Sequence, residues 1–177
     1  MRIPFNDNNS KIGIEGWFEF KDEKLIFYIK PTNSFEDWKS DFIAFRSNDI
    51  LAKCKVHTGF KMYARWMNDF IIKLANIKAM RPEDIYIFGY SMGGGIAQIL
   101  GEYNSSFNII SVDGPRTTTK LSNKKSTLYF NKGSLVNNVP FWFKRIENAI
   151  CLNYKWRPFW KSHVDYDINE IIERVIN

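Results

Sequence analysis

The first clear pattern of hydrophobic and polar positions is a pair of apolar runs within residues 14–30, separated by the polar segment Lys21-Asp22-Glu23-Lys24. Two β-rich runs around a short polar turn predict a β-hairpin whose second arm enters the core. We expect the central sheet to start with this hairpin. Residues 32–42 carry turn and capping residues and then aromatic side chains at helical spacing, which indicates a short helix or a structured loop. Another short strand is predicted around residues 53–57.

The middle of the chain carries the pattern of a helix followed by a buried strand. From Phe60 to Ile77, apolar residues recur every three or four positions, which predicts an amphipathic helix ending before Arg81 and Pro82. Residues 84–89 form a short, almost wholly apolar run, as expected of a strand covered on both faces in a parallel sheet. The next segment, SMGGGIAQILGEY, is predicted to be a helix packed closely on that strand.

The second half continues the alternation of strands and helices. Residues 107–113 and 126–131 have the character of further strands, and the tail, residues 167–177, has the pattern of a closing helix. Strand, helix and strand in succession imply a right-handed βαβ crossover, so we expect a single α/β domain over residues 1–177. Before the tail lies an aromatic and basic stretch, residues 140–163.

The composition is that of a folded globular protein with a basic balance. Hydrophobic residues make up 45% and charged residues 25% of the 177 positions, which excludes collagen-like and intrinsically disordered chains. Lys and Arg total 25 against 19 Asp and Glu, and this net charge of +6 favours anionic partners. The basic residues are scattered, with short pairs at Lys124-Lys125 and Lys144-Arg145, so we expect an ordinary solvated surface and no nucleic-acid partner.

Cysteine usage and the start of the chain bear on cofactors and compartment. Cys54 and Cys151 are far apart in the sequence, and no Cys or His cluster has the spacing of metal ligands. We expect both cysteines to be reduced core residues, and we expect the protein to need neither metal nor cofactor. The N-terminal segment turns polar after five residues, and no run approaches ~18 apolar residues, so the expectation is a soluble, cytoplasmic protein.

The strongest chemical signal is Gly89-Tyr90-Ser91-Met92-Gly93, a Gly-x-Ser-x-Gly motif between a predicted strand and a predicted helix. In that context the motif is typical of a nucleophile elbow, a strained turn that exposes a serine hydroxyl at a helix N-terminus. Glycines are needed around it because side chains would collide with the neighbouring strand and helix. We predict that Ser91 is a nucleophile and that the Met92 backbone N–H stabilises an oxyanion.

Other interpretations of this glycine-rich segment fit less well. A dinucleotide site needs a final small residue that the sequence after Gly95 lacks, and a phosphate-binding loop needs a Lys that is absent. The motif also occurs by chance where glycines only permit close packing, but the strand and helix on either side favour the elbow.

A serine nucleophile requires a base, and the sequence holds two histidines, His57 and His163. The α/β-hydrolases carry their histidine last in chain order, in a loop before a final helix, and His163 occupies that place. We therefore predict His163 as the base. His57 precedes the nucleophile at a predicted strand end and is interpreted as a structural, hydrogen-bonded histidine.

Several motifs occur in an order that resembles the class 3 lipases, the fungal-type triacylglycerol lipases of the α/β-hydrolase superfamily. Residues 56–60 (VHTGF) are similar to that family's Val-His-x-Gly-Phe, GYSMGGGIAQ to its Gly-His-Ser-Leu-Gly-Gly elbow, and residues 113–116 (DGPR) to its Gly-x-Pro-Arg. The resemblance covers most of the chain. It implies an α/β-hydrolase fold of near-minimal size, with a mostly parallel central sheet and helices on both faces. It also implies a serine lipase or esterase that hydrolyses acyl esters.

Carried over residue by residue, the resemblance implies Thr32 as the first oxyanion-hole residue beside Met92, with Ser91 as nucleophile and His163 as base. Thr32 follows the second arm of the predicted hairpin, where its backbone N–H and its hydroxyl can both donate to an oxyanion. The alternative is that Thr32 only caps the segment that begins at Asn33.

The acid that should orient the histidine departs from the family pattern. The family carries it in Asn-x-x-Asp-x-Val-Pro-x-x-Pro, and in the matching stretch, residues 131–140, Ser134 stands where the aspartate should be. Asp113 is the best replacement, because it ends the strand next to the predicted nucleophile strand. The alternative role of Asp113 is a turn or helix cap. Asp165 and Asp167 are poorer candidates, and Ser134 can also orient the ring through its hydroxyl.

The aromatic side chains of residues 140–163 have two interpretations, a pocket or cap for an acyl chain and ordinary core packing. If they are exposed beside the basic residues of the same stretch, they favour contact with an anionic membrane surface. Because the acid departs from the family pattern, the alternative to an ester hydrolase is a weakly active or inactive lipase-like protein that binds lipid or a protein partner. The aromatic members are Phe141, Trp142, Phe143, Tyr154, Trp156, Phe159 and Trp160, and the basic members are Lys144, Arg145, Lys155, Arg157 and Lys161.

Overall fold

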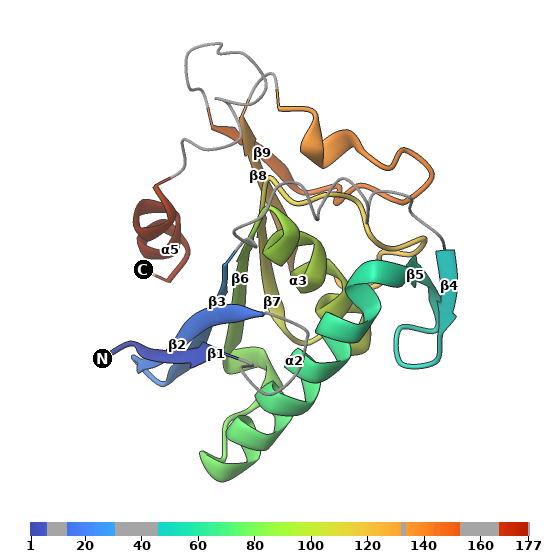
Figure 1. The fold of residues 1–177 in the computed structure, drawn as a ribbon. Helices are drawn as coiled ribbons and strands as arrows, with labels where there is room; N and C mark the ends of the chain where they lie inside the picture. Colours follow the sequence, from blue (N-terminus) through green and yellow to red (C-terminus); the bar gives the residue numbers. More distant parts are fainter. Residues whose placement is uncertain (7–13, 31–45, 132–133, 153–166, 177) are drawn as a thin grey trace.

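A seven-stranded sheet runs through the centre of the protein (Figure 1). The computed structural model describes residues 1–6, 14–30, 46–131, 134–152 and 167–176. In this part of the chain the sheet order is β1-β2-β3-β6-β7-β8-β9, and β4 and β5 form a separate two-stranded sheet. The strands are β1 (Ile3–Asn6), β2 (Glu15–Lys21), β3 (Lys24–Ile29), β4 (Arg46–Asp49), β5 (Cys54–His57), β6 (Ile85–Tyr90), β7 (Asn108–Val112), β8 (Ser126–Asn131) and β9 (Ala149–Leu152). The helices are α2 (Thr58–Ile77), α3 (Met92–Tyr103) and α5 (Ile168–Ile176), with short 3₁₀ turns η1 (Pro82–Asp84) and η2 (Val136–Asn138).

The hairpin predicted from the first apolar runs is formed by β2 and β3, which close at the pair Lys21 and Lys24. Asp22 and Glu23 between them have φ values of 49° and 60°, the left-handed geometry of a two-residue turn whose twist matches the strands. The prediction that the sheet starts here is wrong, because β1 pairs antiparallel with β2 at the edge of the sheet. From β3 through β6, β7, β8 and β9 every pairing is parallel, which confirms a mostly parallel sheet.

Helices cover both faces of the sheet, as expected (Figure 1). Leu25, Phe27 and Ile29 of β3 belong to the larger buried cluster, which α2 and α3 complete on one face. The intervening Ile26 belongs to a second cluster on the other face, where it packs with Ile171 of α5. The alternation along β3 follows from the two-residue period of a strand. Among the described residues, no helix is both long enough and apolar enough to cross a membrane.

Some expectations from the sequence differ from the structure. The strands β1, β4 and β9, each four residues long, were not predicted. Cys54 and Cys151 are free thiols and both are only partly buried, and Cys54 packs against the larger core cluster. The predicted short helix or loop at residues 32–42 lies outside the described residues.

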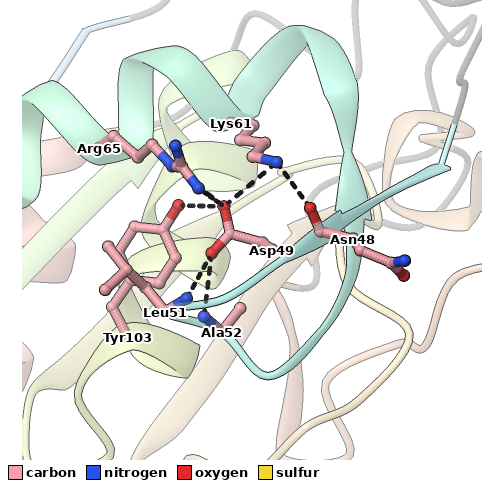
Figure 2. A network of polar contacts seen from close by, with 7 residues as sticks. All are labelled: Asn48, Asp49, Leu51, Ala52, Lys61, Arg65 and Tyr103. Carbon is pink, nitrogen blue, oxygen red and sulfur yellow. Dashed lines mark hydrogen bonds and ion pairs between the residues drawn. The ribbon is translucent and has the colours of Figure 1, made fainter.

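A buried carboxylate fastens the β4–β5 sheet to helices α2 and α3 (Figure 2). Asp49 Oδ1 accepts hydrogen bonds from the backbone N–H groups of Leu51 and Ala52, at 2.8 and 3.1 Å. Its Oδ2 accepts from Arg65 Nε of α2 and from the Tyr103 hydroxyl of α3, both at 3.2 Å. Burial raises the pKa of Asp49, but the Ala52 hydrogen bond and the Arg65 charge outweigh it and hold the pKa below its usual value. The network thus stabilises the position of α3, the helix that begins next to Ser91.

Candidate active site

Ser91 occupies the turn between β6 and α3 and has the strained backbone predicted for a nucleophile elbow. Its φ and ψ are 53° and −119°, a region that residues other than glycine rarely adopt. Two hydrogen bonds hold this turn. The Ser91 N–H donates to the Val112 carbonyl of β7 at 2.9 Å, and the Gly95 N–H donates to the Ser91 carbonyl at 3.2 Å. The backbone is therefore fixed from the neighbouring strand and from the first turn of α3.

The glycines around Ser91 let the helix lie directly on the strands. A Cβ on Gly89 would lie 2.1 Å from the Gly93 carbonyl oxygen, and a Cβ on Gly95 would lie 2.9 Å from Thr117 Cγ2. Real Cβ atoms do not approach backbone or neighbouring methyl groups this closely. These contacts support the explanation of the glycine pattern given by the sequence, that side chains at these positions would collide with adjacent elements.

Met92 is the first residue of α3, directly after Ser91. Backbone N–H groups in the first turn of a helix point along the axis toward the positive end of the helix dipole. The Met92 N–H therefore has the direction required of an oxyanion donor next to the Ser91 hydroxyl. The Met92 side chain is buried and forms part of the larger core cluster, which fixes the start of the helix.

Asp113 lies beside Ser91 at the carboxyl ends of two adjacent parallel strands. Tyr90 and Val112 are register partners and the last residues of β6 and β7, so Ser91 and Asp113 directly follow two strands whose backbones run about 4.8 Å apart. Asp113 is fully buried and has a φ of 47°. Its N–H donates to the Tyr129 carbonyl of β8 at 2.7 Å. The structure thus places the predicted acid and the predicted nucleophile at one edge of the sheet.

Two side chains from the segment after β8 donate to the Asp113 carboxylate. The Ser134 hydroxyl donates to Oδ2 at 2.6 Å, and the Asn137 side-chain amide donates to Oδ1 at 3.0 Å. Ser134 therefore lies beside the predicted acid, and its hydroxyl donates to Asp113. Sequence reasoning assigned no role to Asn137. Its proximity to Asp113 arises only when the loops after β7 and β8 fold together.

Thr32 and His163 lie outside the described residues, as do Asp165, Tyr154, Lys155, Trp156, Arg157, Phe159, Trp160 and Lys161. Asp167, one of the poorer acid candidates, is described and accepts hydrogen bonds at Oδ1 from the N–H groups of Asn169 and Glu170. This is the arrangement of a helix N-cap, so Asp167 starts α5.

His57 is buried at the junction of β5 and α2, and its ring stacks on Phe60 with 4.4 Å between centroids. The ring of Phe143 lies 6.1 Å away, and the His57 N–H of the backbone donates to the Thr117 carbonyl at 2.8 Å. Among the described residues, Nδ1 has no hydrogen-bond partner, so the predicted side-chain hydrogen bond is not seen at this atom. Burial lowers the pKa of His57 from 6.5 to about 4, so the ring is neutral at pH 7. These contacts fit a structural role.

The lowered pKa of His57 makes the protein less stable in mild acid. As the pH falls from 6.5 toward 4, the unfolded chain binds a proton at this histidine while the folded protein resists it, so stability is lost across that window. The full effect is about 3 kcal/mol of unfolding free energy. Urea denaturation at several pH values should show a steeper decline for the natural protein than for His57→Phe, which keeps an aromatic stack without a titrating group. Equal pH dependences of the unfolding free energy in the two proteins would contradict a lowered pKa of His57.

A pocket in the described part of the chain is lined by residues other than Ser91 and Asp113. A pocket of about 140 Å³ is lined by Leu121, Asn123, Lys124, Ser126, Ile146, Glu147 and Asn148, none of which is a predicted site residue. Over the described ranges, no group of three or more His, Cys, Asp and Glu residues is arranged to hold a metal ion.

Comparison with known families fits this geometry. The sequence profile of the lipase (class 3) family matches residues 26–144, more than half of the chain, and the match includes most of β3, the Ser91 elbow, Asp113 and Ser134. The chain belongs to the class 3 lipase family. A search of the curated proteins finds no match.

Solved lipase structures share the fold of this chain. The Lip2 lipase of Yarrowia lipolytica superposes with a TM-score of 0.70 at 19% identity, over 86% of this chain and 67% of that one. The mono- and diacylglycerol lipase of Aspergillus oryzae gives 0.73 at 17% identity, over 86% and 63%, and lipase II of Rhizopus niveus gives 0.63 at 21%, over 78% and 59%. The α/β-hydrolase fold is therefore confirmed, while this chain spans about three fifths to two thirds of the length of these relatives.

Proposed function

We propose that this class 3 lipase hydrolyses carboxylic esters of acyl chains, glycerolipids or phospholipids among them, through a covalent acyl-serine intermediate. The observation that carries the proposal is the backbone of Ser91, with φ 53° and ψ −119° at the junction of β6 and α3. A residue in such a region persists only when its surroundings over-determine it, and strain of this kind clusters at functional sites. Family membership supports the same reaction class.

Each group in the proposed mechanism has a defined task. The Ser91 oxygen attacks the acyl carbonyl while His163 takes its proton, and the tetrahedral intermediate then expels the alcohol, which receives that proton. Water repeats the sequence on the acyl-enzyme and releases the carboxylic acid. The Met92 and Thr32 N–H groups hold the oxyanion, at about 3 kcal/mol of transition-state stabilisation for each donor. Asp113 orients the His163 ring. The roles of Thr32 and His163 rest on the sequence, and the mechanism uses neither metal nor cofactor.

A fluorophosphonate probe tests the proposal directly, because it phosphonylates an activated serine and leaves ordinary serines unlabelled. The full chain should be labelled at Ser91, as located by peptide mass analysis, and should release p-nitrophenol from p-nitrophenyl esters of several chain lengths. A folded chain that shows neither labelling at high probe concentration nor ester turnover would support the inactive, lipid-binding alternative.

A second role, contact with an anionic membrane surface, is supported by exposed aromatic side chains in the segment that follows η2. Phe141 and Trp142 are 76% and 42% exposed, and their rings contact each other with 4.8 Å between centroids. Lys144 is exposed two residues later, and Leu135 is also exposed. Peripheral membrane binding has two components. Aromatic rings enter the membrane–water interface, and neighbouring cations attract acidic headgroups.

Removing both rings is expected to weaken membrane binding. Since burying one large apolar side chain contributes about 1.5–3 kcal/mol, the double variant Phe141→Ala/Trp142→Ala should bind at least about tenfold more weakly to phosphatidylcholine vesicles containing phosphatidylserine. Sedimentation with the vesicles measures the change. Ile77→Ala, which removes an exposed apolar side chain from the end of α2, is the matched control. Equal binding by both variants would remove this surface from consideration.

A further inference from the structure

The Asp113 carboxylate is held between two loops that are far apart in the sequence. Asp113 follows β7, whereas Ser134 and Asn137 follow β8, and each of the latter donates to a different carboxylate oxygen. All three residues are buried. The 2.6 Å separation of Ser134 Oγ and Asp113 Oδ2 is in the range of hydrogen bonds to a charged carboxylate, which are roughly twice as strong as neutral ones.

We propose that residues 113 and 134 form one acid position reached from two loops, in which Asp113 carries the carboxylate while Ser134 and Asn137 are positioning residues that aim it. The inference rests on the proposed serine mechanism and specifies how its acid is held. The donors on Oδ1 and Oδ2 come from different residues, so together they fix both the place and the plane of the carboxylate. An ionised carboxylate offers about four lone-pair positions, so these two donors are compatible with a third from a histidine N–H.

The geometry explains why only one of the two positions carries an acid. The side chains of residues 113 and 134 meet at 2.6 Å, so a carboxylate at each would place two like charges in contact. A serine at 134 instead donates a proton to the carboxylate. A carboxylate on residue 134 would lie close to the present position of the Asp113 carboxylate. Residue 113 would then have to supply the hydrogen-bond donor.

An exchange of the two side chains tests this inference. Asp113→Asn keeps a side chain that tolerates the positive φ at this residue and can donate to a neighbour. We expect this variant to lose about 10⁴-fold in kcat for a p-nitrophenyl ester. The double variant Asp113→Asn/Ser134→Asp should recover roughly 100-fold of that loss, because the carboxylate returns to the shared position. Ser134→Asp alone should lower activity, because it places two carboxylates in contact.

The decisive outcome is the direction in which Ser134→Asp changes kcat. The substitution should lower kcat when Asp113 is present and raise it in the Asp113→Asn background. A double variant that is folded by circular dichroism and no more active than Asp113→Asn overturns the shared position. Failure of the proposed function is distinguishable, because the natural protein itself would then show no ester turnover.

The positioning role of Ser134 has its own readout in the pH dependence of kcat/KM, whose acid limb reports the base of the free enzyme. A well-aimed carboxylate stabilises the imidazolium. Ser134→Ala should therefore move the acid limb to lower pH and reduce kcat by about tenfold, with KM nearly unchanged. Ser134→Thr, which keeps the hydroxyl, should restore both. A loss of stability in Ser134→Ala without a shift of the limb would mean that Ser134 is only structural.

Discussion

Replacement of Ser91 by alanine is expected to lower kcat for p-nitrophenyl esters by about 10⁵- to 10⁶-fold. Loss of the nucleophile removes the acyl-enzyme route and leaves only the contribution of the oxyanion donors and binding. The strained backbone at residue 91 is held by the Val112 carbonyl and by the Gly95 N–H, and neither contact uses the Ser91 side chain. The variant should therefore remain folded while turnover and fluorophosphonate labelling disappear together.

Ser126 provides the matched control for this substitution. Ser91 and Ser126 are both 7% exposed, and Ser126 lies on β8, two strands away from β6, the strand that precedes Ser91. Ser126→Ala removes the same atom from a similarly buried site, and we expect its activity to stay within about twofold of the natural protein. Comparable losses in the two variants would show that Ser91 acts through packing alone.

The central elements could be predicted from the sequence because their patterns are local and strong. The stripe from Phe60 to Ile77 became α2, and the apolar run at residues 84–89 became β6, displaced by one residue. Such elements bury their apolar faces on neighbours whichever topology is adopted, so periodicity alone identifies them. The hairpin of β2 and β3 was equally visible, because its two-residue turn is a local structure.

The short strands could not be predicted, because their structure depends on the partner strand. β1 and β9 lie at the two edges of the seven-stranded sheet and have four residues each, too few to show a period. Pro4 within β1 argues against a strand in a sequence, yet an edge strand tolerates proline because one side of its backbone need not pair. Tertiary pairing decides such segments.

The candidate site likewise contains residues that could be predicted from the sequence and residues that could not. The elbow at Ser91 is encoded within five consecutive residues, so motif and context were sufficient. Asp113 could be proposed as the acid because it comes at the end of the strand next to the predicted nucleophile strand. The contacts of Ser134 and Asn137 with Asp113 join residues 21 and 24 positions apart in sequence, through two loops whose meeting no periodicity reports.

Replacement of Gly93 by alanine is expected to lower the free energy of unfolding by about 3 kcal/mol and to disable the elbow. A Cβ at residue 93 would lie 2.3 Å from the Ile29 carbonyl oxygen, a backbone atom at the end of β3. Ile29 is the register partner of Gly89, so α3 cannot retreat from β3 without disturbing the β3–β6 ladder that leads to Ser91. Urea denaturation measures the loss, and p-nitrophenyl ester turnover of the folded fraction measures the effect on the elbow.

Gly101 of the same helix separates this collision from the intrinsic effect of alanine. In a helix interior, exchanging glycine for alanine favours the helix by roughly 1 kcal/mol. At Gly101 the three nearest atoms to a new Cβ all belong to side chains, with Ile109 Cγ1 at 2.9 Å and Asn123 Nδ2 at 3.2 Å, so side chains and no backbone would have to shift by a few tenths of an ångström. Gly101→Ala should therefore stay within about 1 kcal/mol of the natural stability and keep its activity. Equal free energies of unfolding for Gly93→Ala and Gly101→Ala would contradict the explanation that residue 93 must be glycine because α3 approaches β3 closely.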